Sequence, residues 1–147
     1  MRRNTRHHTL LFLILLVDSV NELLTSTLNL LGLSKHPVLD INFILHNLLW
    51  MWLLSKLSRN PLIARYMLVV FLLIAAANLS FFEGTTEFNF VTIIVGGLFY
   101  ILLFTLENYR RLQEEDYAFF FSNHYLLLFA PVVFFFSYGV LLSFRSH

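Results

Sequence analysis

Apolar runs of about twenty residues constrain this chain more than any other feature, because about twenty helical residues cross ~30 Å of hydrocarbon. Five such runs, separated by short polar turns, predict an all-α polytopic membrane helix bundle with five transmembrane helices. Within a single transmembrane domain of residues 1–147, we expect the spans at residues 10–31, 38–57, 62–82, 88–106 and 124–144. The longest polar segment, residues 107–116, is too short to bury a core of its own.

The composition supports this assignment and narrows the chemistry. Only 13% of the residues are charged, whereas soluble domains carry about 25%. The absence of cysteine excludes disulfides, thiol catalysis and thiolate metal sites. The sequence contains no HExxH, no GxSxG and no glycine-rich phosphate loop. No basic patch is large enough to suggest nucleic acid. We therefore expect no enzyme, no catalytic residues, no bound metal and no cofactor.

The start of the chain has a rival interpretation. A basic tail before the apolar residues 10–17 also resembles a secretory signal peptide. However, the apolar run passes into Asp18 without a small-residue cleavage site, and its helical pattern continues to Leu31. Gly32 is typical of a helix C-terminus and Pro37 of the first turn of the next helix. We therefore expect the first two spans to form an antiparallel pair.

The basic residues predict the orientation, since Lys and Arg favour the cytoplasmic side. With five spans, eight of the ten basic residues fall on the side of the N-terminus, and two, Lys35 and Arg145, fall on the other. We expect the N-terminus in the cytoplasm and the C-terminus outside.

Polar groups concentrate on the first two spans, where they predict a polar seam. The helical spacing of Asp18, Glu22, Thr25 and Asn29 puts them on one face, with Asn21 beside them. An ionised carboxylate near mid-bilayer costs about 3 kcal/mol on insertion scales, so this face should meet protein. The residues predicted to form the seam are Asp18, Glu22, Asn29, Asp40, Asn42, His46 and Asn47.

Helix rise predicts how the seam is paired. Counted from the turn at ~1.5 Å per residue, Glu22 lies level with His46 and Asn47, and Asn29 lies level with Asp40. We expect these layers to form hydrogen bonds across the helix pair. Asp18 falls deeper, near Trp50, without an evident partner.

Three interpretations of the seam stay open. Its groups can simply fix helix packing, each hydrogen-bonded pair contributing about 0.6–2 kcal/mol. They can form a cavity for protons, an ion or a small polar ligand, because intramembrane acids are often functional. They can also meet another membrane protein that completes the seam. Haem or metal ligation by His46 and His124 is a weaker alternative.

Several of these residues occur in a recognisable order. An acid-bearing first span is followed by Gly32, Leu33 and Ser34, by the polar segment from Asn42 to His46, by FNFVTII at residues 88–94 and by an aromatic-rich last span. This order resembles a group of uncharacterised multi-pass membrane proteins of Bacteroidota. The resemblance implies a bacterial inner membrane, and members of the group often carry one more span at the N-terminus. It implies no activity and no site residue.

The sequence leads to ranked expectations about function. We expect a non-enzymatic sensory or accessory subunit that lies in the lipid bilayer and acts through another membrane or signalling protein, or as a homo-oligomer. The alternative is a proton- or ion-coupled transporter or channel subunit that uses the polar seam. A membrane enzyme acting on lipid, built around His124 and Glu107, is a third and weaker hypothesis.

Overall fold

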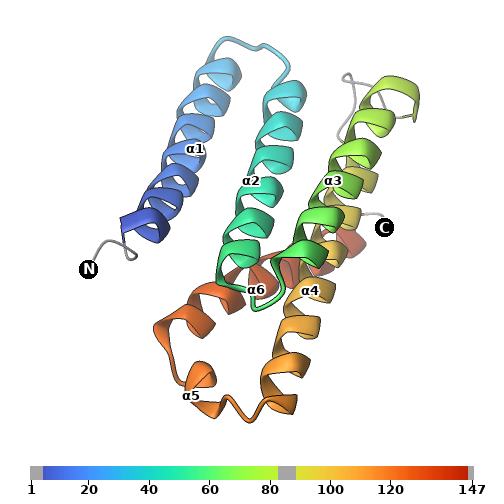
Figure 1. The fold of residues 1–147 in the computed structure, drawn as a ribbon. Coiled ribbons are helices and arrows are strands. Elements are labelled where there is room, and N and C mark those ends of the chain that lie inside the picture. Colours follow the sequence, from blue (N-terminus) through green and yellow to red (C-terminus); the bar gives the residue numbers. More distant parts are fainter. Residues whose placement is uncertain (1–4, 83–88, 146–147) are drawn as a thin grey trace.

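Helices make up every regular element of the part of the chain that the computed structural model describes, residues 5–82 and 89–145 (Figure 1). The long helices are α1 (Thr5–Leu30), α2 (His36–Leu57), α3 (Pro61–Ala77), α4 (Phe90–Gln113) and α6 (Asn123–Arg145). A π-helical turn, η1 (Asn78–Phe82), continues α3, and a short helix, α5 (Tyr117–Phe120), precedes α6. Residues 1–4 of the basic tail, the acidic loop at residues 83–87 and the predicted start of the fourth span at residue 88 lie outside the described residues.

Four of these helical segments are long and apolar enough to cross a membrane, which confirms the prediction of an all-α membrane bundle at this level. They are Thr9–Leu30, His36–Leu57, Pro61–Phe82 and Phe90–Gln113. In α6 the apolar stretch found among the described residues, Asn123–Ser137, is shorter. Large apolar side chains cover the outside of the bundle, as expected for surfaces that face lipid.

The turns form for local reasons that the sequence signals. At the end of α1, Gly32 has a φ of 66°, a left-handed conformation that glycine adopts without steric cost. The Leu33 amide then donates to the Leu28 carbonyl at 2.9 Å, which satisfies one of the last carbonyls of α1. Between α2 and α3, the Asn60 side chain accepts from the Leu62 amide at 3.3 Å, and Pro61 occupies the first position of α3.

The core lies between α2, α3, α4 and α6. Met51, Phe71, Tyr100 and Leu128 are fully buried there, one from each of the four helices. The Tyr100 hydroxyl donates to the Leu128 carbonyl at 2.8 Å and so holds α6 against α4, while α6 continues through Pro131. Helix α1 lies outside this core and packs mainly on α2, at the edge of the molecule (Figure 1).

Candidate functional site

A polar cluster formed by Asp18, His46 and Trp50 lies in the contact between α1 and α2. The indole N–H of Trp50 donates to Nε2 of His46 at 2.8 Å. Since the indole can only donate, Nε2 must accept, and Nδ1 then carries the proton in the neutral ring. His46 Nδ1 lies 3.0 Å from Asp18 Oδ1, so it donates to the carboxylate. The imidazole therefore couples an intramembrane acid on α1 to an aromatic donor on α2.

The prediction that Glu22 shares a layer with His46 or Asn47 is wrong, because Asp18 occupies that place and Glu22 is exposed. The buried or half-buried residues of α1 include Leu11, Ile14, Asp18, Asn21, Thr25 and Leu28, which follow one another by alternating steps of three and four. This spacing is a heptad pattern, and it rotates the contact face away from Glu22 and Asn29. Helix α2 therefore does not hide both acids of α1, and even the Asp18 side chain is 42% exposed.

The prediction that Asn29 pairs with Asp40 is also wrong. Asn29 is exposed, whereas Asp40 is buried and faces the start of α4. One Asp40 oxygen accepts from the Asn89 backbone amide at 3.0 Å, and the other accepts from its side-chain amide at 2.9 Å. The reason is electrostatic, since a helix N-terminus presents free N–H groups that stabilise a negative charge. The start of α4 offers these groups, and α1 does not.

The Asp40 contact continues into a buried network that sequence reasoning did not predict. The Asn78 amide of η1 donates to the Asn89 side-chain oxygen at 2.9 Å and lies 3.0 Å from the Thr92 hydroxyl. Asn78, Asn89 and Thr92 are all buried. We call Asp40, Asn78, Asn89 and Thr92 the first clamp, because it joins α2, α3 and α4 at the end of the bundle that also holds the α1–α2 turn.

The two remaining predicted seam residues lie in different places. Asn47 is fully buried, donates to the Phe43 carbonyl at 3.0 Å and faces Gly96, where an added Cβ would lie 2.7 Å from its Cγ. It therefore belongs to the α2–α4 contact. Asn42 instead lines a groove of about 320 Å³ between α1 and α2, together with Asn21 and apolar side chains. The side-chain oxygens of Asn21 and Asn42 are buried without a hydrogen-bond partner among the described residues.

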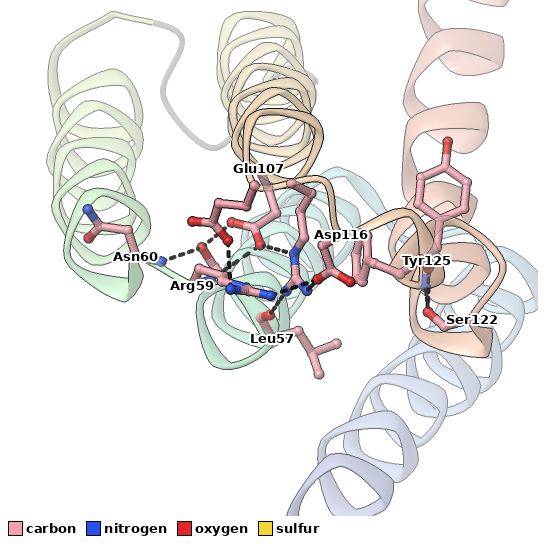
Figure 2. Close-up of polar contacts among 11 residues, drawn as sticks. Leu57, Arg59, Asn60, Glu107, Asp116, Ser122 and Tyr125 are labelled. Atoms are coloured by element: carbon pink, nitrogen blue, oxygen red, sulfur yellow. Dashed lines mark hydrogen bonds and ion pairs between the residues drawn. The ribbon is translucent and has the colours of Figure 1, made fainter.

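A second polar cluster lies at the opposite end of the bundle (Figure 2). It was not predicted from the sequence. Glu107 of α4 is only 2% exposed and accepts from the Ser58 hydroxyl at 2.6 Å and from the Arg59 amide at 3.2 Å. Arg111, one turn further along α4, lies 2.8 Å from Glu107 and donates to the Leu57 carbonyl at 3.0 Å. The end of α2 and the turn after it therefore form hydrogen bonds with both members of an ion pair on α4.

The loop after α4 completes this cluster. Asp116 lies 2.8 Å from both Arg59 and Arg111, and Arg59 also pairs with Glu114 at 2.6 Å. The hydrogen bonds from Arg111 and Arg59 lower the pKa of Asp116 below its ordinary value, and the Asp116 carboxylate raises the pKa of Arg59. We call Ser58, Arg59, Glu107, Arg111 and Asp116 the second clamp.

A sequence signal for the second clamp exists in the spacing of Glu107 and Arg111. Acid and base four residues apart form a common ion pair on a helix, but this spacing usually marks a solvated face. The structure buries the pair because the α2–α3 turn packs over it. Arg111 also lies 3.9 Å above the Phe119 ring of α5, a cation–π contact.

The described residues contain no group of three or more His, Asp or Glu side chains arranged to hold a metal ion. His46 is enclosed by Trp50 and by Phe134 and Phe135 of α6, and His124 lies at the exposed start of α6. His46 and His124 therefore lie in different parts of the structure and do not form a shared ligand site. No protein-family model, curated protein or solved structure matches the chain.

Proposed function

We propose that this protein is a five-span integral membrane protein of a bacterial inner membrane that acts as a non-enzymatic sensory or accessory subunit through contacts with partner proteins. The 23 residues of α6 are enough for a fifth crossing. The excess of Lys and Arg on the side of the N-terminus supports a cytoplasmic N-terminus and an outside C-terminus. These two features support the proposed spans and orientation. The exposed surface of the helices supports the proposed role.

The exposed surface of α1 carries the proposal. Only 11% of the residues in the apolar stretch of α1 are buried inside the bundle, against 44% for α4. Glu22 lies about 12 Å from the end of α1, well inside a span, and is exposed. A carboxyl group at such a depth is costly against lipid and becomes favourable when another protein supplies hydrogen-bond partners. The two clamps use their polar groups within the bundle, so α1 is the helix best suited to bind a partner.

Photo-crosslinking in native membranes tests this proposal. A photoreactive residue at Ser26, on the same side of α1 as Glu22, should give a discrete protein adduct, and the additional change Glu22→Leu should reduce it. Thr27 is the matched control, because it is also exposed and lies one residue further along the helix on a different face. If neither position yields a discrete protein adduct, α1 has no protein partner and the proposal fails.

The contact of Asp18 with His46 favours the alternative, a proton- or ion-coupled transporter or channel subunit. An acid and an imidazole 3.0 Å apart can exchange a proton. The groove between α1 and α2 passes Asn21 and Asn42, but neither Asp18 nor Glu22 lines it. Proton flux into vesicles that contain the purified protein, abolished by Asp18→Asn and retained by Asn29→Ala, would favour transport over the accessory role. Flux that survives neutralisation of both Asp18 and Glu22 would exclude a coupling role for these acids.

A further inference from the structure

The imidazole ring of His46 gives its two nitrogens different partners. Nδ1 lies 3.0 Å from Asp18 Oδ1, and Nε2 accepts from the indole N–H of Trp50 at 2.8 Å. Because the indole can only donate, this arrangement requires a neutral ring with its proton on Nδ1. The conclusion does not depend on the charge of Asp18, since a carboxyl group accepts a hydrogen bond from Nδ1 in either of its forms.

Protonation of His46 affects these two hydrogen bonds unequally. The free lone pair of the neutral ring is on Nε2, so an added proton binds there. Nδ1 goes on donating to Asp18, whereas Nε2 becomes a donor that points at the N–H of Trp50. Two donors cannot form a hydrogen bond at the 2.8 Å that now separates these nitrogens. The indole must therefore move away from the ring when the proton binds.

The side chains around His46 leave this hydrogen bond as the one that responds to a proton. In the described part of the chain, Asp18 approaches His46 from α1, Trp50 from its own helix, and Phe134 and Phe135 from α6. Of these four neighbours only Asp18 titrates, and its contact is with the nitrogen that stays a donor. The phenyl rings supply no lone pair that could replace Nε2 as an acceptor for the indole.

Trp50 is placed so that its movement reaches two parts of the molecule. Its side chain packs against the main core, to which Met51 belongs, and also against a smaller cluster that contains Ile14 of α1 and Leu53 of α2. Close-packed interiors transmit the shift of one side chain to its neighbours. A proton on His46 therefore alters the contact of α1 with α2 and the core between the other helices together.

We propose that His46 and Trp50 form a proton-operated switch. Protonation of His46 breaks its hydrogen bond with Trp50 and changes the packing of the indole between the two clusters, while the hydrogen bond with Asp18 remains. This inference rests on the proposed function in that it supplies acid as the stimulus of a sensory subunit. It differs from proton-coupled transport, because the proton that binds to His46 does not have to cross the membrane.

Nuclear magnetic resonance of the isotopically labelled, purified protein in detergent micelles tests the switch. The chain has two tryptophans, and Trp52→Phe leaves Trp50 as the single indole, at an exposed position where the change should not disturb the core. At neutral pH, Nδ1 of His46 should be protonated and Nε2 should not. In acid, Nε2 should take up a proton, and the Trp50 N–H signal should move with the same midpoint towards that of an indole without a hydrogen bond.

Two histidine variants and two methyl signals show whether the switch acts as proposed. His46→Phe, which keeps a ring but has no nitrogen to titrate, should abolish the pH dependence of the Trp50 signal. His124→Gln is the matched control, because it removes an exposed histidine at the start of α6 and should leave the titration unchanged. The methyl signals of Met51 and Ile14 should move with the midpoint of His46, since these residues belong to the two clusters.

The result that would overturn the switch takes one of four forms. These are a proton on Nε2 at neutral pH, a Trp50 signal that stays constant while His46 is protonated, a His46 that stays neutral until the protein unfolds, and methyl signals of Met51 and Ile14 that do not move. Each leaves the proposed function standing, because the purified protein contains no partner. Failure of photo-crosslinking in native membranes would instead remove the accessory role and leave the hydrogen-bond switch itself unaffected.

Discussion

Between α2, α3 and α4, the polar groups of the two clamps pair with one another, whereas most polar residues of α1 are exposed. The first clamp joins these three helices at one end, and the second clamp joins the α2–α3 turn to α4 and α5 at the other. Helix α1 contacts α2 through the hydrogen bond of Asp18 with His46, and the Asp18 side chain is 42% exposed.

This difference indicates two roles for polar groups in apolar surroundings. A buried pair that is fully hydrogen-bonded fixes one arrangement of helices, because breaking it leaves an unpaired group in a medium without water. An exposed polar group on a membrane helix gains little until a second protein covers it. Polar substitutions in the clamps should therefore change folding, while those on the exposed surface of α1 should change association.

The largest effect should come from the second clamp. Glu107→Ala removes one of the two carboxylates that pair with the mostly buried Arg111, and it leaves the Ser58 hydroxyl and the Arg59 amide without their acceptor. The free energy of unfolding should therefore fall by about 3–5 kcal/mol. Denaturant unfolding in detergent micelles measures the loss. The control is Arg110→Ala, which removes a neighbouring charge from the same helix end and should change stability by less than about 1 kcal/mol. Equal losses from the two variants would contradict the special role of the clamp.

In the first clamp the expected loss of stability is smaller, and it can be compared directly with a change at the partner predicted from the sequence. Asp40→Ala removes the acceptor of two hydrogen bonds from Asn89 and should lower the free energy of unfolding by about 1–3 kcal/mol. Asn29→Ala, which alters the partner that helix rise assigns to Asp40, should leave folding unchanged. Unfolding in detergent again measures both variants. A loss from Asn29→Ala equal to that from Asp40→Ala would restore the pairing inferred from the sequence.

The sequence contained enough information to predict the helices, because their length and composition are set by the membrane. Gly32, Pro37 and Pro61 marked the turns closely for the same local reasons that the structure shows. Five crossings and their orientation stay predictions. The contacts of the polar seam were harder to predict, since Glu22 and Asp18 share a face in a rough helical projection. The choice between them depends on a rotation of α1 that only packing against α2 decides.

The clamps were beyond sequence reasoning for a different reason. Each joins residues far apart in the chain, such as Asp40 with Asn89 and Ser58 with Glu107. Their partners are set by where the ends of α2 and α4 meet. Residues close in sequence therefore predicted the turns, whereas distant ones needed the three-dimensional structure.

The smallest effect concerns pH at the second clamp. Since the pKa of Asp116 is lowered below its ordinary value of 3.8 by Arg111 and Arg59, its carboxylate stabilises the folded state above that value. The stabilisation is lost as pH falls through the folded pKa, because the carboxyl then takes up a proton and leaves both arginines. Asp116→Asn should therefore lower the melting temperature in detergent by a constant amount near neutral pH, and this difference should vanish in strong acid. Glu115→Gln, one residue away on an exposed side chain, should show no such trend. A difference between wild type and Asp116→Asn that persists unchanged at the most acid pH would mean that the second clamp holds Asp116 by its shape and not by its charge.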